Sequence, residues 1–177
     1  MKNRAIFLDR DGVINKTIVR DGKAFSPRSR NEFVIIDESA QFVKTMKEAG
    51  FKVIVVTNQP DIARAKLSFA DLEWMTKRII AEIQVDEVVV CPHDDHDNCN
   101  CRKPKPGMLL KSSNKWKTNL SRSYMVGDSW KDIEAGKRAG CTCILIDKLY
   151  NKDIECSFRV TSLGEAAKLI LREKRRR

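Results

Sequence analysis

The chain lacks any hydrophobic run long enough to span a membrane, because a spanning helix needs about 20 consecutive apolar residues and no stretch of this sequence approaches that length. Its first ten residues, MKNRAIFLDR, contain a run of only four apolar residues before the first acidic one. A secretory signal peptide needs an apolar core of about 7–15 residues. We therefore expect a cytoplasmic protein that does not associate with membranes.

Long linkers and internal repeats are also lacking, so nothing in the sequence marks a boundary between two large domains. A chain of 177 residues can bury a sizeable core within one domain. We predict a single domain over residues 1–172, followed by a basic tail over residues 173–177. We also expect the protein to be a monomer.

Aromatic residues are few, at 7% of the chain. They do not alternate with basic residues to form the stacking surface that single-stranded nucleic acid needs. The formal net charge is nevertheless +10, of which the last four residues supply four. Since positive charge favours an anionic partner, we expect a small phosphorylated metabolite, and nucleic acid fits less well.

What the chain does contain is a set of polar clusters that each follow a short apolar run. The first run, Ala5 to Leu8, leads into Asp9 and Asp11, and Gly12 lets the backbone turn closely past them. Such runs, closed by a turn signal, predict buried strands. The clusters that follow the later runs are Thr57 with Asn58, then Lys103, then Asp128 with Asp132. Because ligands bind at the carboxyl ends of strands in an open α/β sheet, we expect all four clusters to meet.

Strand and helix patterns alternate along the whole chain. The predicted strands lie at 5–8, 52–56, 88–90, 124–126, 142–146 and 158–160, and the predicted helices at 38–49, 68–83, 106–116, 131–139 and 163–171. This alternation predicts the α/β class, as a single three-layer Rossmann-like domain with a mainly parallel sheet. The core elements leave no room for a large cap domain. The site should therefore be open, bordered by a loop at 16–31 and by a cysteine-rich loop.

The six cysteines indicate metal binding or burial, because disulfides are rare in a reducing compartment. Cys91, His93, Cys99 and Cys101 supply three thiolates and one imidazole within eleven residues. This set is sufficient for a closed, tetrahedral zinc site. With no open coordination position, the zinc should be structural, and it should shape the zinc-binding loop that leads to Lys103.

Four stretches of the sequence together carry a family resemblance. They are FLDRDGVIN, VVTNQ, CPH followed by CxCRKPKPGM, and MVGDSWKDIEAGKRAGC. In these stretches and their order, the chain resembles the haloacid dehalogenase-like phosphohydrolases, and within them the histidinol-phosphate and heptose-bisphosphate phosphatases. The resemblance runs from Ala5 to about Ile146. It implies a Mg²⁺-dependent phosphatase that works through an aspartyl-phosphate.

The chemistry of phosphoryl transfer gives each cluster an expected role. Asp9 would attack phosphorus, and Asp11 would protonate the leaving oxygen and later deprotonate the hydrolytic water. The resemblance implies that Mg²⁺ is held by Asp9, the backbone carbonyl of Asp11 and Asp128. The remaining roles go to Thr57, the Asn58 amide and Lys103 as partners of the phosphoryl oxygens, to Arg102 as a substrate clamp, and to Asp132 as the group that orients Lys103.

The substrate is the least determined feature of the resemblance. The stretch KPKPGMLL is similar to the heptose members, whereas the short loop from Cys91 to Cys101 is similar to the histidinol-phosphate members. Arginines at positions 20, 28, 30 and 102 offer positive charge for a second anionic group. We therefore expect D-glycero-D-manno-heptose 1,7-bisphosphate, a substrate of carbohydrate metabolism. Histidinol phosphate, nucleic-acid ends and a non-catalytic, zinc-stabilised binding role remain as alternatives.

Overall fold

The computed structural model describes residues 3–20 and 22–176. Residues 1, 2, 21 and 177 lie outside the described part of the chain, and with them the first two residues of the predicted domain and the last residue of the predicted basic tail. Within the described residues, no helix is both long and apolar enough to cross a membrane.

Six parallel strands form the central sheet, in the spatial order β5-β4-β1-β6-β7-β8. They are β1 (Arg4–Leu8), β4 (Phe51–Asn58), β5 (Glu87–Cys91), β6 (Tyr124–Gly127), β7 (Thr142–Ile146) and β8 (Phe158–Val160). The chain builds outward from β1 in one direction through β4 and β5, then returns to β6 on the other side of β1. Beyond the carboxyl ends of β1 and β6 lies the switch point at which open α/β sheets bind ligands.

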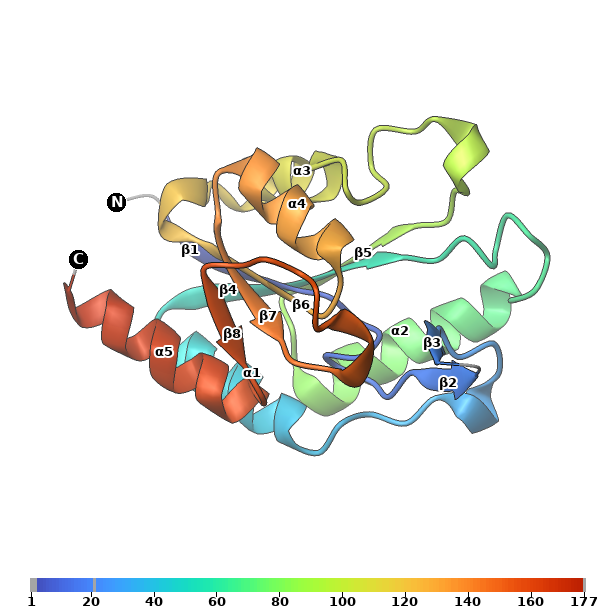
Figure 1. The fold of residues 1–177 in the computed structure, drawn as a ribbon, viewed down its shortest axis with the longest axis horizontal. Coiled ribbons are helices and arrows are strands. Elements are labelled where there is room, and N and C mark those ends of the chain that lie inside the picture. The colour runs from blue at the N-terminus through green and yellow to red at the C-terminus, as the bar shows by residue number, and fades with distance from the viewer. Residues whose placement is uncertain (1–2, 21, 177) are drawn as a thin grey trace.

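Helices cover both faces of this sheet (Figure 1). One face carries α1 (Glu38–Glu48), α2 (Phe69–Ile83) and α5 (Leu163–Arg176), and the other carries α3 (Gly107–Trp116) and α4 (Trp130–Ala139). Two apolar clusters correspond to the two faces: Met46 and Met75 pack in the first, and Met108 and Ile133 in the second. The three layers confirm the predicted α/β Rossmann-like fold.

The structure differs from the sequence prediction mainly at the ends of β4 and α5, where polar residues continue the strand or helix beyond its predicted end. Strand β4 runs on through Thr57 and Asn58, because these residues pair in register with Val90 and Cys91 of β5. Helix α5 continues past the predicted end near Leu171 to Arg176. Its last turns contain lysine, arginine and glutamate, which are good helix formers.

The loop predicted at 16–31 is more ordered than expected. It contains an antiparallel hairpin of β2 (Ile18–Arg20) and β3 (Lys23–Phe25), followed by the 3-10 turn η1 (Arg30–Glu32). In Figure 1 this hairpin lies beyond the carboxyl ends of the strands, on the same side as the zinc-binding loop with η2 (Asp95–Asp97). Further 3-10 turns are η3 (Leu120–Arg122) and η4 (Leu149–Asn151). No cap domain is found among the described residues, so the hairpin and the zinc-binding loop form the walls of the site.

Helix α4 approaches the sheet closely at Gly136, which gives a test of this packing. A Cβ atom on Gly136 would lie 2.6 Å from the Cys143 sulfur and 2.7 Å from the Met125 Cβ atom. We expect Gly136→Ala to lower the free energy of unfolding in denaturant titrations, because overpacking costs about 1–3 kcal/mol and the gain in helix propensity returns only about 0.5–1 kcal/mol.

The matched control is Gly164→Ala in α5, where the nearest atom would lie 3.6 Å from the new Cβ. This is ordinary contact, so we expect the control to keep or raise the stability. Equal stability of the two variants would contradict the proposed close packing of α4.

Candidate active site

A cleft with a volume of about 540 Å³ lies at the carboxyl edge of the sheet. Asp9 follows β1, Asn58 ends β4 and Asp128 follows β6, while Lys103 comes from the segment between β5 and α3. All four residues line the cleft, which also includes Asp11 and Arg102. The fold thus brings the predicted clusters together at the switch point of the sheet.

Lys103 lies at the centre of this site and contacts two of its carboxylates. Only 2% of its surface is exposed. Its ammonium nitrogen lies 2.7 Å from Asp9 Oδ1 and 2.6 Å from Asp132 Oδ1, and donates a 2.9 Å hydrogen bond to the Val56 carbonyl. The hydrogen bonds to Asp9 and Val56 use two of its three N–H groups, and Asp132 adds an ion pair. Burial alone would lower the pKa of Lys103, but the charges of Asp132 and Asp9 outweigh it and raise that pKa. Lys103 is therefore a permanent cation.

Asp9 is held with one oxygen occupied. Its Oδ1 accepts hydrogen bonds from Lys103 Nζ and, at 2.7 Å, from the Arg10 backbone N–H. Among the described residues no hydrogen bond reaches Oδ2, which leaves that oxygen open to a ligand. Burial raises the pKa of the Asp9 carboxyl well above its ordinary value, and the charge of Asp132 adds to this while Lys103 opposes it. The carboxylate cluster therefore has more negative charge than one lysine neutralises.

Asp11 is surrounded by hydrogen-bond donors. Its carboxylate accepts from Asn15 Nδ2 at 2.9 Å, from Ser26 Oγ at 2.9 Å and from Gln59 Nε2 at 2.7 Å. The fully buried Arg10 donates to it through Nε and Nη2, at 3.1 and 3.0 Å. Burial tends to raise the pKa of Asp11, but Arg10 and the other donors outweigh it, so the pKa lies below its ordinary value. Asp11 is thus ionised and fixed in orientation.

Asp128 faces Asp9 from the end of β6 and has 5% of its surface exposed. Burial and the charge of Asp132 raise the pKa of the Asp128 carboxyl to about 7. Its Oδ2 accepts a hydrogen bond from the Tyr150 hydroxyl. A Cβ atom on Gly12 would overlap this oxygen, at 1.8 Å, so only glycine allows the turn after Asp11 to approach Asp128 this closely.

Three carboxylates therefore lie together at the floor of the cleft. Ligand oxygens of Asp9, Asp128 and Asp132 all lie within 4.8 Å of one another. Oxygen ligands with excess negative charge suit a hard divalent cation such as Mg²⁺. Asp132 is already committed, since its Oδ1 pairs with Lys103 and its Oδ2 accepts from the N–H and hydroxyl of Ser129. Asp9 and Asp128 remain as the side chains that fit a metal.

Thr57 and Asn58 occupy different positions in the site. Thr57 is fully buried and is not among the residues that line the cleft, and its hydroxyl accepts a 2.8 Å hydrogen bond from Gln59. The Asn58 side chain is engaged with the Lys103 backbone, donating to its carbonyl at 2.9 Å and accepting from its N–H at 3.0 Å. This side chain therefore fixes the Lys103 segment, and only the backbone amide of Asn58 could serve a phosphoryl group.

Arg102 lies in the cleft wall, with 8% of its surface exposed. Its Nε donates to Asp95 at 2.7 Å and its Nη1 to the His93 carbonyl at 3.3 Å. Arg102 thus joins the zinc-binding loop to the cleft. The other arginines predicted to border the site do not line the cleft among the described residues.

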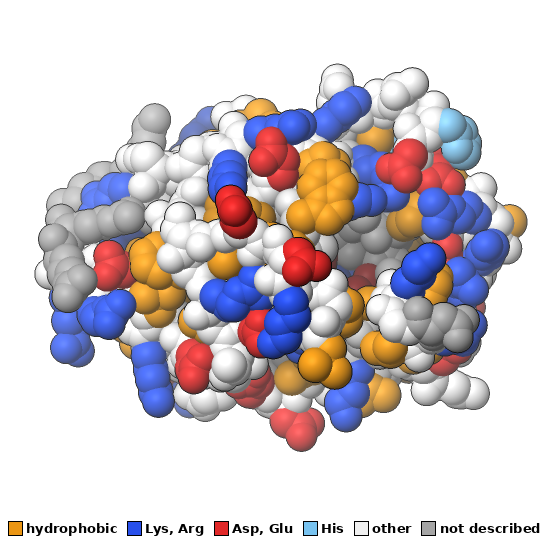
Figure 2. Space-filling view, in the orientation of Figure 1, with side chains coloured by type: hydrophobic (Ala, Val, Ile, Leu, Met, Phe, Trp, Pro, Cys, Tyr) orange, Lys and Arg blue, Asp and Glu red, His pale blue; other side chains and the backbone are white. Residues whose placement is uncertain are grey.

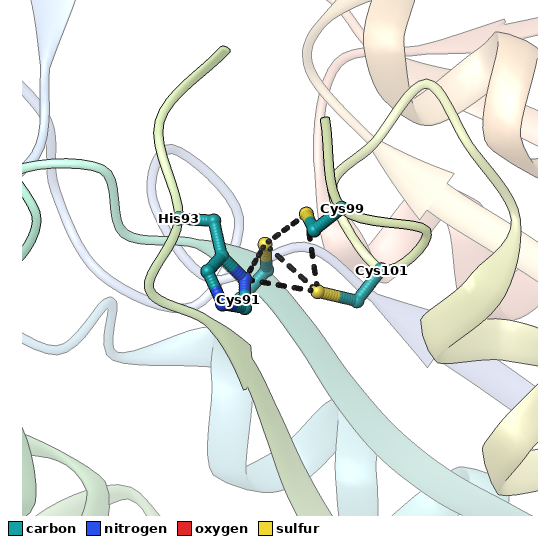
Figure 3. Close-up of side chains that lie close together, drawn as sticks. All are labelled: Cys91, His93, Cys99 and Cys101. Carbon is teal, nitrogen blue, oxygen red and sulfur yellow. Dashed lines mark hydrogen bonds between the residues drawn. The ribbon is translucent and has the colours of Figure 1, made fainter. Parts of the chain in front are cut away.

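The predicted zinc ligands converge in the loop after β5 (Figure 3). The Cys101 sulfur lies 3.1 Å from the Cys91 sulfur, 3.4 Å from the Cys99 sulfur and 3.3 Å from His93 Nδ1, and Cys91 lies 3.6 Å from both Cys99 and His93. Zinc bonds of about 2.3 Å to sulfur and 2.0–2.1 Å to nitrogen require ligand separations of about 3.5–3.8 Å. The four side chains therefore fit a zinc ion with little adjustment.

Polar contacts hold this loop at both ends. Arg64 makes a paired contact with Asp94, at 2.5 and 2.6 Å, and Lys105 donates to the Cys99 carbonyl at 2.8 Å. His96 is not part of the cluster, because 78% of its side chain is exposed. Contacts with Arg64 and Lys105 thus hold the loop independently of a metal.

Several residues that contact the catalytic candidates were not identified from the sequence, among them Arg10 and Asn15, which bind Asp11. Gln59 and Ser26 bind Asp11, and Tyr150 binds Asp128. Gln59 belongs to the stretch VVTNQ, so that motif carried a usable signal. Ser26 and Tyr150 come from the hairpin segment and from η4, whose positions over the cleft depend on the fold rather than on a local pattern.

Comparison with known proteins gives a consistent relationship. A family model described as haloacid dehalogenase-like hydrolase matches residues 17–140. D-glycero-beta-D-manno-heptose-1,7-bisphosphate 7-phosphatase of Pseudomonas aeruginosa is 38% identical over 151 residues, covering 82% of each chain. D-glycero-alpha-D-manno-heptose-1,7-bisphosphate 7-phosphatase of Burkholderia mallei is 36% identical over 188 aligned residues, covering 99% of this chain and 92% of the relative.

A solved structure agrees with these relatives. The D,D-heptose 1,7-bisphosphate phosphatase from B. bronchiseptica, complexed with magnesium and phosphate, superposes with a TM-score of 0.84 at 28% identity, covering 96% of this chain and 99% of that one. These similarities confirm the resemblance drawn from the sequence motifs. The chain therefore belongs to the haloacid dehalogenase-like hydrolases, in the phosphatase group that includes the heptose 1,7-bisphosphate phosphatases.

Proposed function

We propose that this phosphatase hydrolyses the 7-phosphate of D-glycero-D-manno-heptose 1,7-bisphosphate through an aspartyl-phosphate on Asp9. The observation that carries the proposal is the arrangement of Asp9, with Lys103 on one oxygen and the other oxygen open at the floor of the cleft. The names of the relatives support the substrate. That the protein is a monomer stays a prediction.

In the first half of the reaction, Asp9 Oδ2 attacks phosphorus and the bond to the sugar oxygen breaks. Asp11 gives a proton to that leaving oxygen. The low pKa of Asp11 in the free enzyme favours its ionised form, but a phosphoryl dianion bound beside it raises that pKa, because like charges disfavour ionisation. The Thr57 hydroxyl, the Asn58 backbone amide and the Lys103 ammonium hold the phosphoryl oxygens.

In the second half, water attacks the aspartyl-phosphate and Asp11 accepts its proton. Its hydrogen bonds with Arg10, Asn15 and Gln59 hold the carboxylate in one orientation, which suits a base that must act at a fixed point. Asp132 positions Lys103 through their ion pair. Free phosphate is released, Asp9 is again ionised, and Asp11 is again protonated, as it was when the substrate bound.

Mg²⁺ is the proposed cofactor of the cleft. Asp9, the Asp11 backbone carbonyl and Asp128 would hold it. When bound, it would neutralise the repulsion between the Asp9 carboxylate and the phosphoryl oxygens. Tyr150 holds the Asp128 carboxyl in place by a hydrogen bond.

Zinc is the proposed structural metal of the loop formed by Cys91, His93, Cys99 and Cys101. All six cysteines are free thiols, and this fits a reducing compartment. We therefore also propose a cytoplasmic location. The division into a domain at 1–172 and a basic tail at 173–177 stays a prediction.

The substrate proposal is tested by comparing kcat/KM for three compounds, at low and moderate salt. They are the heptose 1,7-bisphosphate, histidinol phosphate and a 3′-phosphorylated oligonucleotide. We expect the bisphosphate to be preferred and to yield the 1-phosphate. Preference for the oligonucleotide with a steep salt dependence, which counterion release would produce, would overturn the proposal. Absence of phosphate release from any ester would favour a non-catalytic role.

The roles of Asp9 and Asp11 are separated by Asp11→Asn, with Asp9→Asn as its control. p-Nitrophenolate leaves without protonation, so Asp11→Asn should still form the aspartyl-phosphate but hydrolyse it about 10²–10⁴-fold more slowly. We expect a burst of p-nitrophenolate equal to the enzyme concentration, with slow release of phosphate. Asp9→Asn should give neither burst nor turnover, with a native fold in its circular dichroism spectrum, because the asparagine fills the same volume and Lys103 keeps its ion pair with Asp132. Normal turnover of either variant would show that its assigned role is wrong.

The zinc proposal predicts one tightly held zinc per chain after purification without added metal, measured by elemental analysis. Structural zinc sites contribute about 10–16 kcal/mol of apparent binding energy, comparable to the stability of a whole domain at about 5–15 kcal/mol. Cys99→Ser should therefore lose zinc, lower the melting temperature and reduce turnover. Cys156→Ser is the matched control, because Cys156 is only partly buried and lies outside the cluster, and it should retain zinc. Full activity of a zinc-free Cys99→Ser protein would exclude the proposed role.

A further inference from the structure

We propose that Lys23 and Lys131, which both line the cleft, form a second anion site that binds the phosphate that is not transferred. This inference rests on the proposed function and deepens it, because it assigns residues to the second phosphate of a sugar bisphosphate. Lys23 belongs to β3 of the hairpin, and Lys131 lies in the first turn of α4. Both residues line the cleft.

The arginines that the sequence offered for this task are already paired. Arg20 contacts Glu32 at 3.4 Å, Arg28 contacts Asp61 at 2.6 Å, Arg30 contacts Asp71 at 2.7 Å, and Arg102 contacts Asp95 at 2.7 Å. Of the four, only Arg102 lines the cleft. Arg20, Arg28 and Arg30 are therefore poorly placed to bind a second phosphate, and Arg102 is engaged by Asp95 and by the His93 carbonyl.

The two lysines differ from these arginines in having no committed partner. Among residues 3–20 and 22–176, the side-chain ammonium of neither Lys23 nor Lys131 forms an ion pair or a hydrogen bond with protein. Lys131 is half-buried, and its nitrogen lies 5.8 Å from the centre of the neighbouring Trp130 ring. Its nearby charge contributes to lowering the pKa of Asp95, although the Arg102 hydrogen bond is the larger cause. An unpaired ammonium at a cleft wall is suited to an anionic ligand.

The floor of the cleft carries excess negative charge, whereas the parts nearer its opening carry positive charge. On the floor, Lys103 is shared between Asp9 and Asp132, which leaves Asp128 without a cation. Elsewhere in the cleft, neither Lys23 nor Lys131 forms an ion pair within the described part of the chain, and Asp95, the acidic residue near Lys131, is paired with Arg102. Figure 2 shows blue lysine and arginine side chains around the hollow on the right half of this face. A substrate with phosphates at both ends satisfies both regions, since one end meets the metal-binding floor and the other meets the two lysines.

The helix that carries Lys131 adds to this site. Ser129 caps α4, and the cap residue itself lines the cleft. The N-terminus of a helix favours negative charge, so Lys131 and the start of α4 act in the same direction on a bound phosphate. The volume of about 540 Å³ lies within the range of about 300–1,000 Å³ that small-ligand sites have.

The test compares bisphosphates with monophosphates in the variants Lys23→Gln, Lys131→Gln and the double variant. The first readout is kcat/KM for the heptose 1,7-bisphosphate and for its 7-phosphate. The second is competitive inhibition of p-nitrophenyl phosphate hydrolysis by fructose 1,6-bisphosphate and fructose 6-phosphate. We expect Lys131→Gln to reduce the preference for the bisphosphate about tenfold, mainly through KM, and the double variant to reduce it further, since each variant loses a hydrogen bond between charged groups.

Two controls separate this site from general electrostatics. Lys77→Gln removes an equal charge from the exposed face of α2, where Lys77 pairs with Glu73, and should leave both preferences unchanged. Arg30→Gln tests the arginine explanation and should also have no effect. Equal losses for bisphosphate and monophosphate, or a larger loss in Arg30→Gln than in Lys131→Gln, would overturn the proposal.

Failure of the proposed function gives a different result. In that case the wild-type enzyme would not hydrolyse the heptose bisphosphate, yet fructose 1,6-bisphosphate would still inhibit more tightly than fructose 6-phosphate, and the lysine variants would abolish the difference. If the wild-type enzyme shows no such difference in inhibition, the second anion site does not exist.

Discussion

The ion pairs of Lys103 with Asp9 and Asp132 are the interactions on which the rest of the site depends. Their three side chains come from the segment after β5, from the end of β1 and from α4 after β6, so they form only when the sheet has its observed strand order. Breaking a buried pair by removing one partner leaves an uncompensated charge and costs about 3–5 kcal/mol. The same contacts therefore stabilise the fold and hold one oxygen of Asp9, and the geometry of the site follows directly from the topology.

Burial also explains why this site selects charged ligands. Asp9 and Asp128 sit where water is scarce, and burial raises the pKa of each. Asp11 is nearby but has a lowered pKa, because Arg10 and several neutral donors surround it. The same fold thus raises the pKa of two carboxyl groups and lowers the pKa of a third one nearby. Enzymes use such differences to give identical side chains different chemical roles.

The sequence predicted the framework well and its connections poorly. Strands at 142–146 and 158–160 were predicted at their observed bounds, because each is a short run closed by turn residues. The clusters led by Asp9, Thr57, Lys103 and Asp128 met as expected, since parallel strands end at one edge. Side-chain pairing had no such local signal: Arg28 meets Asp61 across the cleft wall, and Tyr150 reaches Asp128 from a turn without a motif. Such contacts depend on loops whose positions only tertiary packing determines.

No cap domain is found among the described residues, so substrate selection depends on the two short walls of the cleft, the hairpin and the zinc-binding loop. A cap can close over a ligand, whereas an open cleft must hold its specificity groups in place before the substrate arrives. The hairpin wall is tied to the body by the contact between Arg28 and Asp61, and the opposite wall by Arg64 with Asp94 and by the four-residue cysteine and histidine cluster. Because these walls are fixed, a closing motion does not distinguish one phosphorylated sugar from another. The charged side chains on the walls do.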